Sequence, residues 1–307
     1  MTLEFTPKPG KPLALPELVQ LLKTSSMVDN VSCGHYQREE IEIASQWLVD
    51  FAANKQEILD IICNQLVFPN QFQSGNDVQP PTFILYSDQR FAVRMVLWLP
   101  PGPQSAPAPF SWLEPHDHNF DFLTTNFFGD GYTTRLYEYD YDSVDGVEGE
   151  EVAMNYFGEQ MLSPGKVIFF FRSKDMHIQF PPPNLSVSIN IIIQPRGNGQ
   201  RQYEFDLDRE NNADFQVARI KNGRFERFRA HKALFSVLMK EGNERSRELL
   251  HTIASSHTRE ELRSIAFVSM LSFSTDTQYR DQVYHLAMSD PSSYVRVQAQ
   301  QCMLTLA

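Results

Sequence analysis

The chain has 307 residues, 42% of them hydrophobic, which is enough for one large domain or two ordinary ones with a sizeable core. Its formal net charge of −11 argues against a nucleic-acid-binding surface over the whole molecule. Three widely spaced cysteines form no disulfide framework, and no signal peptide or membrane-length apolar run is visible, so we expect a cytoplasmic protein.

Residues 1–67 are predicted to form an N-terminal helical segment. Three prolines make residues 1–12 an irregular lead-in. Residues 14–24 favour a helix, because Pro16 is tolerated in a first helical turn. Between residues 37 and 66 apolar residues recur at three- and four-residue steps, which indicates two helices interrupted near Asn54.

Residues 68–212 consist of short extended stretches rich in β-branched and aromatic residues. Clusters of Pro, Gly, Asp and Asn separate these stretches, and no helix-period segment intervenes. Many short strands at close spacing are typical of an antiparallel sandwich or barrel. The predicted strands are Phe83–Tyr86, Phe91–Leu99, Phe110–Leu113, His116–Phe122, Tyr132–Tyr141, Met154–Phe157, Val167–Phe171, Ser186–Gln194 and Tyr203–Asp206.

Residues 213–307 return to a helical period and form a predicted C-terminal helical region. Apolar residues around Leu250 reappear around Val283, 33 residues later, and Ser289–Ala299 resembles the turn and second helix of a HEAT-type repeat. An ordinary helical cap is the alternative. The predicted helices are Arg224–Lys240, Glu244–Ser255, Arg259–Leu271, Gln278–Met288 and Tyr294–Leu306.

Two histidines stand two residues apart in the segment Glu114-Pro115-His116-Asp117-His118. Side chains two apart in an extended chain point to the same face, so His116 and His118 would lie side by side, with Asp117 turned away. His177 follows in a separate, strand-like apolar stretch. Three imidazoles suffice to hold one divalent metal ion, and imidazole is a ligand of Fe, Zn, Cu and Ni. A pair of surface histidines in a loop is the alternative.

The β-rich middle is similar to the cupin superfamily over about residues 83–206. The first cupin motif contains a His-x-His pair, then a glutamate three or four residues on, and ends at a glycine. Here His116 and His118 match the pair, and Gly129 or Gly131 matches the closing glycine.

The second cupin motif joins a turn of the Pro-x-Gly kind and a strand to a third histidine. Here Leu162–Phe170 contains that turn and strand and leads to His177. The resemblance therefore implies a jelly-roll barrel in which His116, His118 and His177 are the metal ligands.

The sequence departs from the cupin pattern at the glutamate, because Phe122 and Leu123 occupy the positions where it would fall. Asp121 lies one residue early, and strict alternation puts it on the face opposite His118, so its role as a fourth ligand stays open. A three-histidine centre resembles that of the cysteine-dioxygenase-like cupins, where Fe(II) holds O2 and substrate together. It implies a mononuclear non-haem Fe(II) oxygenase, a hydroxylase or dioxygenase, acting on a small amino-acid-like or peptidyl substrate. Another divalent metal is the alternative.

A second resemblance is to the jumonji-type 2-oxoglutarate oxygenases, carried by His116, Pro164-Gly165, His177 and Ser186–Asn190. Those enzymes hold iron with two histidines and one carboxylate. In this chain His118 occupies the acid position, so 2-oxoglutarate is an alternative cosubstrate and not the favoured one.

Arg94 stands in the apolar stretch Phe91–Trp98, where a charge must be paired or functional. If the barrel binds a small acid, Arg94 or Arg135 would pair with the carboxylate through two hydrogen bonds. Either could instead point into solvent. Tyr132 and Tyr137 are candidates to supply a phenol at the same substrate-binding site.

These patterns together predict an α+β protein: an antiparallel β-barrel or jelly roll of the cupin type, with N-terminal helices and a C-terminal HEAT-like region. The expected partners are a small-molecule or peptidyl substrate, a protein partner at the C-terminal helices, and a second copy in a homodimer. Nucleic acid and membranes are not expected. A non-catalytic cupin that binds a ligand or a partner is the alternative from a different functional class.

Overall fold

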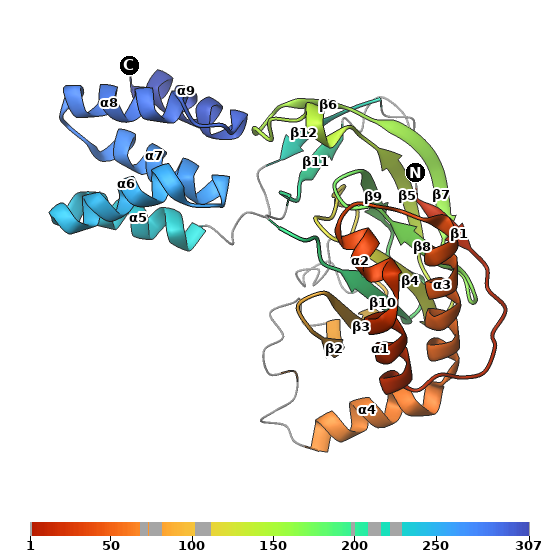
Figure 1. The fold of residues 1–307 in the computed structure, drawn as a ribbon. Helices are drawn as coiled ribbons and strands as arrows, with labels where there is room; N and C mark the ends of the chain where they lie inside the picture. Colours follow the sequence, from red (N-terminus) through yellow and green to blue (C-terminus); the bar gives the residue numbers. More distant parts are fainter. Residues whose placement is uncertain are drawn as a thin grey trace. The chain divides into compact units, whose positions relative to one another are not determined.

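The structure is a computed structural model, and it describes residues 2–67, 73, 82–101, 112–197, 200–207, 216–221 and 229–306. The chain divides into two compact units (Figure 1). The first unit contains residues 1–141 and 153–218, and the second contains residues 142–152 and 219–307. The N-terminal helices and the β-rich middle, which the sequence separates at residue 67, therefore belong to one unit.

The strands of the described chain are short, as the sequence predicts. They are β1 (Leu3–Phe5), β2 (Thr82–Ser87), β3 (Phe91–Trp98), β4 (Asp121–Phe128), β5 (Thr133–Glu138), β6 (Glu151–Ala153), β7 (Asn155–Met161), β8 (Val167–Phe170), β9 (Asp175–Gln179), β10 (Ser186–Ile193), β11 (Glu204–Leu207) and β12 (Val217–Lys221). A 3-10 turn, η1, covers Tyr141–Ser143.

These strands form three sheets. The largest has the order β1-β8-β4-β10-β3-β2, the second β7-β5-β9, and the third β11-β12-β6. The pairings within the first two sheets are antiparallel, which confirms that prediction. The described strands do not close into a barrel, because the largest sheet ends at β1 on one edge and at β2 on the other.

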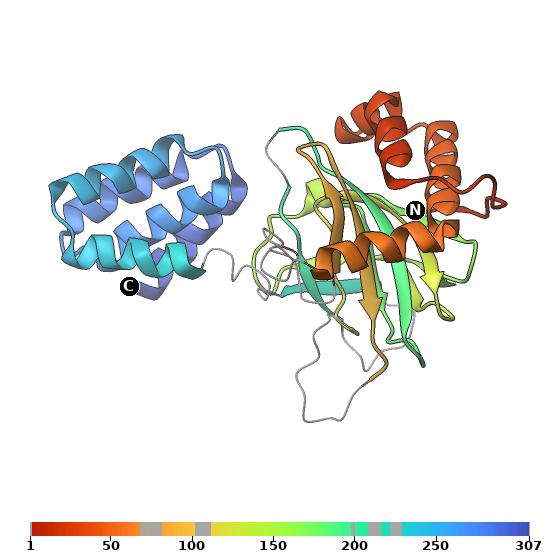
Figure 2. The ribbon, with the colours of Figure 1, turned by 90° about the horizontal axis from the view of Figure 1, so that it is seen from below.

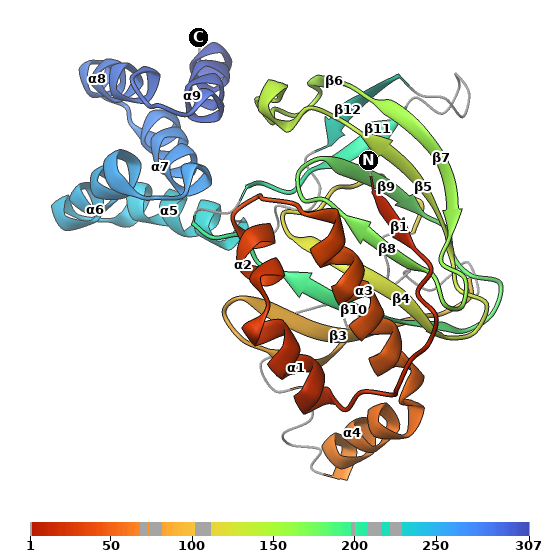
Figure 3. The same cartoon turned by 45° about the vertical axis from the view of Figure 1, so that its right-hand side comes forward.

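The largest sheet is buried on both faces. Every residue of β10 is buried, and its side chains alternate between the two faces. Val187, Ile189 and Ile191 pack with the helices α1 (Leu15–Thr24), α2 (Ser26–Ser32) and α3 (Arg38–Ala53), which lie against this sheet (Figure 3). We call this the helix face. Ile192 packs on the other face with Leu136 of β5, so the first two sheets face one another. We call this the inner face.

The N-terminal helices follow the predicted pattern closely. The break near Asn54 is confirmed, because α3 ends at Ala53 and α4 spans Lys55–Val67. Asn54 caps α3 through its backbone amide, and its side-chain amide donates to the carbonyl oxygen of Leu13 at 3.0 Å.

Five sequence expectations differ from the structure. Residues 116–120 of the predicted strand His116–Phe122 precede β4, and among them His116 alone forms a bridge. Leu3–Phe5 form β1 instead of an irregular lead-in, because they pair with β8. Ser26–Ser32 form α2, which was not predicted. Val217–Lys221 form β12 in a region predicted to be helical. Trp112 and Leu113 lie in a turn instead of a strand. Residues 110–111 and 224–228 of the predicted elements lie outside the described chain.

The second unit contains the helices α5 (Arg229–Glu241), α6 (Glu244–Ser256), α7 (Glu260–Phe273), α8 (Thr277–Met288) and α9 (Ser293–Leu306) (Figure 2). The 33-residue spacing seen in the sequence recurs here, because α6 and α8 begin 33 residues apart, as do α7 and α9. Membership of the HEAT class stays a prediction. None of the described helices has the length and apolarity that crossing a bilayer requires.

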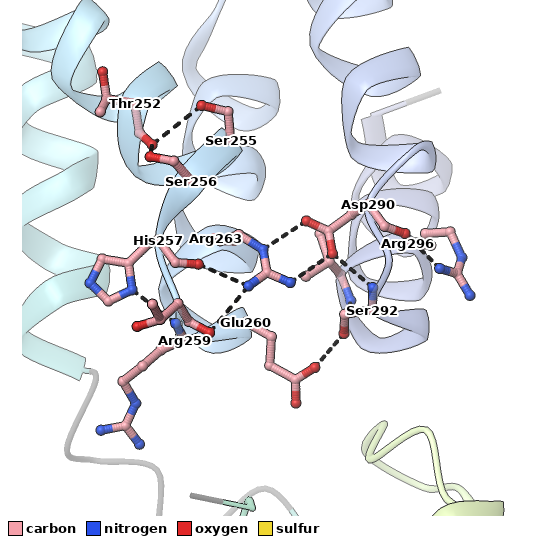
Figure 4. Close-up of polar contacts among 12 residues, drawn as sticks. Thr252, Ser255, Ser256, His257, Arg259, Glu260, Arg263, Asp290, Ser292 and Arg296 are labelled. Carbon is pink, nitrogen blue, oxygen red and sulfur yellow. Dashed lines mark hydrogen bonds and ion pairs between the residues drawn. The ribbon is translucent and has the colours of Figure 1, made fainter. Parts of the chain in front are cut away.

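The repeat extends to individual hydrogen bonds. Asn243 caps α6 by accepting from the backbone amide of Ser246, and Asp276 caps α8 in the same way. Arg263 donates to the carbonyl oxygen of His257 at 2.9 Å, and Arg296 donates to that of Asp290 at 2.6 Å (Figure 4). Asp276, Arg296 and Asp290 each lie 33 residues after Asn243, Arg263 and His257, respectively. The two helix pairs therefore share the same capping and turn contacts.

Candidate metal centre

Three histidines from separate places in the sequence converge in the first unit. His177 lies on β9, and His116 forms an isolated bridge to it. The Nε2 atom of His177 lies 3.1 Å from Nε2 of His116 and 3.2 Å from Nε2 of His118. In the described part of the chain, these three histidines form the group of potential metal ligands in which one ligand atom per residue lies within 4.8 Å of the others. The predicted convergence of the three rings is therefore present in the structure.

The spacing of these nitrogens fits a single metal ion. Nitrogens bound about 2.1 Å from one ion are separated by about 3.0 to 3.4 Å, from octahedral to tetrahedral geometry. The two Nε2–Nε2 distances fall in that interval. Three imidazole lone pairs pointing at one another repel, and a cation among them removes that repulsion. The group could therefore hold one metal ion.

Hydrogen bonds orient two of the rings for this role. His116 Nδ1 lies 2.8 Å from the carbonyl oxygen of Glu114, so Nδ1 carries the proton and Nε2 keeps its lone pair. His177 Nδ1 lies 3.3 Å from the hydroxyl oxygen of Thr134, which also contacts the carbonyl oxygen of Ile178 at 3.4 Å. If the hydroxyl donates to that carbonyl, it accepts from Nδ1 of His177. Such outer contacts fix the tautomer and ring orientation of metal-binding histidines.

Aromatic rings surround the histidines. The centroid of the His118 ring lies 4.8 Å from that of Phe120 and 4.9 Å from that of Phe122, and the His177 centroid lies 5.0 Å from that of Phe170. An apolar shell lowers the local dielectric constant and strengthens the attraction between a cation and its ligands.

Asp117 points away from the metal-facing side of the two histidines that flank it. Its carboxylate accepts from the Tyr139 hydroxyl at 2.6 Å and from the Tyr203 backbone amide at 2.5 Å. Burial raises the pKa of Asp117 to about 7, although these hydrogen bonds act in the opposite direction. Asp117 therefore anchors the segment that carries His116 and His118.

Asp121 is not part of the histidine cluster. Its register neighbour Ile193 packs on the helix face, and its carboxylate is held there by Arg172 and by the Tyr36 hydroxyl at 3.0 Å. The backbone amide of Arg172 adds a third hydrogen bond at 2.9 Å. These contacts give Asp121 a structural role, and they hold it away from the position of a fourth metal ligand.

Two of the four predicted substrate-binding residues lie on the inner face. Arg94 shares that face of β3 with Ala92 and Trp98, and its guanidinium carbon lies 5.6 Å from the centroid of the Phe120 ring. Burial lowers the pKa of Arg94 to about 10, with Tyr132 acting in the opposite direction. Tyr132 packs 4.9 Å from Trp98, measured between ring centroids.

A row of polar side chains crosses the inner face beside Arg94. Asn190 stands opposite Arg94 on one side and opposite Thr124 on the other. The Thr124 hydroxyl donates to the Asn190 side chain at 2.7 Å, and Tyr132 forms a hydrogen bond with Thr124. Within the described chain Arg94 forms no ion pair, and its buried Nε atom forms no hydrogen bond.

The other two predicted residues point away from the histidines. Leu136 stands opposite His177 and faces inward, so its neighbours Arg135 and Tyr137 lie on the reverse face of β5. Arg135 donates two hydrogen bonds to Glu159, at 2.9 and 2.6 Å, and Tyr137 packs against Tyr156. The structure therefore does not bring Arg135 or Tyr137 to the site.

Sequence reasoning overlooked Glu204 and Thr134. Glu204 begins β11 and stands opposite His116 in an antiparallel bridge, and its side chain is buried. The signal that pointed to Arg94, a charge inside an apolar strand, is also present in Tyr203-Glu204-Phe205. A threonine in a strand carries no such signal, so Thr134 had to be found in the structure.

No protein-family model matches the chain, and no curated protein sequence matches it. Solved structures that match include a DMSP lyase structure, at 14% identity and a TM-score of 0.25, with 39% of this chain covering 50% of that one. The coconut allergen cocosin matches at 12% identity and a TM-score of 0.25, and the match covers 40% of this chain and 30% of cocosin. A prolyl-4-hydroxylase of Pseudomonas putida matches at 12% identity and a TM-score of 0.21, and the match covers 46% of this chain and 65% of the hydroxylase. Scores this low carry no conclusion about this chain.

Proposed function

We propose that the chain is a metal-dependent oxygenase whose single Fe(II) ion is held by His116, His118 and His177. The observation that supports this is the convergence of three Nε2 atoms, 3.1 and 3.2 Å apart, inside an aromatic shell. Three protein ligands leave coordination positions open, as in catalytic rather than structural metal sites. When bound, iron in such a centre supplies activation of O2.

The substrate proposed for this centre is a small acid whose carboxylate pairs with Arg94. A guanidinium presents a planar fork of donors that matches a carboxylate, and in a buried setting the pair is strong. Phe120 contacts both the Arg94 guanidinium and the His118 ring. An acid anchored at Arg94 would thus extend past the Phe120 ring toward the histidines.

The remaining inner-face residues would orient this acid. Thr124, Asn190 and Tyr132 offer hydroxyl and amide groups for an amino or hydroxyl substituent. Trp98, which donates to the Ser188 hydroxyl at 2.9 Å, contributes a rigid apolar wall. This set favours an amino-acid-like substrate over an extended peptide.

The test is O2 consumption by anaerobically purified, Fe(II)-loaded protein with a panel of small amino and hydroxy acids. We expect iron-dependent turnover that Arg94→Met abolishes and that Arg135→Met leaves intact, because Arg135 is paired with Glu159 on the reverse face of β5. Stoichiometric zinc without iron-dependent turnover would count against the proposal.

Two alternatives are distinguished by two further measurements. Release of succinate from added 2-oxoglutarate would identify a 2-oxoglutarate-dependent hydroxylase, with Arg94 then holding the cosubstrate. A triple alanine variant of the three histidines with an unchanged cellular role would identify a non-catalytic binding module. A protein partner at the C-terminal helices and a homodimer remain proposals that these assays do not address.

A further inference from the structure

The strand pairing around His116 places a carboxylate beside the histidine cluster. His116 forms antiparallel bridges to His177 on one side and to Glu204 on the other. Residues directly opposite in antiparallel strands project to the same face, with Cβ atoms about 4.5–5.5 Å apart. His177, His116 and Glu204 therefore form one row of neighbours on the face that carries the metal-binding nitrogens.

The hydrogen-bond pattern makes His116 and Glu204 a close pair. The backbone amide of Asp117 donates to the carbonyl oxygen of Tyr203 at 3.1 Å, and that of Phe205 donates to Pro115 at 2.9 Å. These bonds flank the His116–Glu204 pair instead of joining it. In an antiparallel ladder such non-hydrogen-bonded pairs have the closer side chains.

The neighbours of Glu204 confirm the direction of its side chain. Phe205 packs 5.3 Å from Tyr139, measured between ring centroids, and Tyr139 donates to Asp117. Phe205 thus shares the face of Asp117, which is turned away from the histidines. Because side chains alternate along a strand, Glu204 lies on the opposite face, with His116. The residue as a whole is only 6% exposed.

We infer that Glu204 is a carboxylate ligand of the metal ion held by His116, His118 and His177; this inference rests on the proposed metal centre. Three neutral imidazoles leave the full charge of a divalent ion inside an aromatic shell, and one carboxylate halves that charge. Within the described chain the tight cluster contains the three imidazoles alone. The Glu204 carboxylate lies outside that cluster, so its binding to the ion requires rotation about the side-chain bonds of Glu204.

The experiment is a Co(II) titration of the metal-free full-length protein, followed by the visible ligand-field absorption. We expect Glu204→Gln to lower Co(II) affinity at least about tenfold and to change the absorption intensity, because a ligand is lost. Glu204→Asp keeps the carboxylate on a shorter stem and should give an intermediate affinity. Asp206→Asn is the matched control: it lies two residues along the same strand, is exposed, and should bind Co(II) like the wild type.

The outcomes separate this inference from the proposed function. Wild-type protein that binds no Co(II) overturns both. Wild-type and Glu204→Gln proteins with equal affinity and identical spectra overturn the role of Glu204 alone. Should the glutamine variant lose its far-ultraviolet circular dichroism, the aspartate variant decides, and an unchanged affinity and spectrum in that variant overturn the inference.

Discussion

His116 Nδ1 and the carbonyl oxygen of Glu114 lie 2.8 Å apart, so the ring is oriented by the backbone only two residues upstream. The segment is further held by Asp117, whose carboxylate is bound by Tyr139 and by the backbone of Tyr203. His116 and the segment that carries His118 are therefore positioned by contacts within the protein. A preorganised site of this kind binds its ion without a large loss of conformational freedom.

Removal of metal should leave the protein folded but less stable. The helix-face core contains many fully buried side chains that do not depend on an ion, so chelation should preserve the near-ultraviolet circular dichroism. An ion that binds the native state alone adds about 2.7 kcal/mol when its free concentration is 100 times Kd. We expect a higher melting temperature with Co(II) for the wild type and no shift for His118→Ala. Unfolding on chelation would contradict this expectation.

The buried pair of Asp121 and Arg172 should be sensitive to removal of one partner. Asp121 is fully buried, and burial raises its pKa despite the opposing effect of Arg172. Arg172→Met leaves the carboxylate without its cation and should lower the free energy of unfolding by about 3–5 kcal/mol. The measurement is urea denaturation followed by tryptophan fluorescence.

The controls for this pair are a double variant and an exposed pair. Asp121→Asn combined with Arg172→Met should recover much of the loss, because the buried charge is gone. Arg196→Met breaks the pair with Asp29 in the same unit, in which the side chains are 58% and 46% exposed, and should change stability by less than about 1 kcal/mol. Equal effects of the two arginine variants would refute the argument from burial.

Replacement of Arg94 should separate stability from binding. The guanidinium is desolvated and forms no ion pair within the described chain, so Arg94→Met should raise the free energy of unfolding by about 1 kcal/mol. The same variant should weaken binding of a small acid at least about tenfold, because a charge-assisted pair is lost. Calorimetry measures both quantities. A variant that is destabilised and binds normally would show that Arg94 is structural.

The second unit should lose stability in acid through Asp290. Burial would raise the pKa of Asp290, but hydrogen bonds from Arg263 and the Ser292 amide, with the charges of Arg263 and Arg296, lower it overall (Figure 4). A carboxyl whose folded-state pKa is depressed stabilises the fold fully above its unfolded pKa of about 3.9. That contribution disappears as pH falls below this value and through the folded-state pKa.

Hydrogen exchange of the full-length protein tests this behaviour locally. We expect amides of α8 and α9 to lose protection as pH falls below about 4, after correction for the intrinsic exchange rate. Asp290→Asn should remove about 2 kcal/mol at neutral pH and abolish the acid dependence of this site. The exposed Asp281, which lies on α8, serves as the control, and an equal effect of Asp281→Asn would contradict the assignment.

The sequence predicted those features that depend on local periodicity. The helix break at Asn54 and the starts of α6 and α7 fall within one residue of their predicted positions, because helical period and capping are local. The strand β1 was missed because three residues just before a proline-rich stretch carry no local signal and are extended only by pairing with β8. The open edges at β1 and β2 are likewise a long-range property.

The residues of the candidate site likewise fall into those that a local sequence signal predicts and those that depend on long-range pairing. His116 and His118 are paired by their spacing, and Arg94 is conspicuous as a charge in an apolar strand. Leu136 faces inward, and Arg135 and Tyr137 face outward, because β5 pairs with β9 in the register that sets Leu136 opposite His177. That register cannot be read from the sequence. The position of Glu204 beside His116 depends on pairing between segments nearly ninety residues apart.

Anaerobic equilibrium dialysis against Fe(II) tests the central claim most directly. The wild-type protein should bind one Fe(II) per chain, and His177→Ala, with unchanged far-ultraviolet circular dichroism, should bind less than a tenth as tightly. A wild-type protein that binds no Fe(II), or a His177→Ala variant that binds it as tightly as the wild type, would contradict the three-histidine centre.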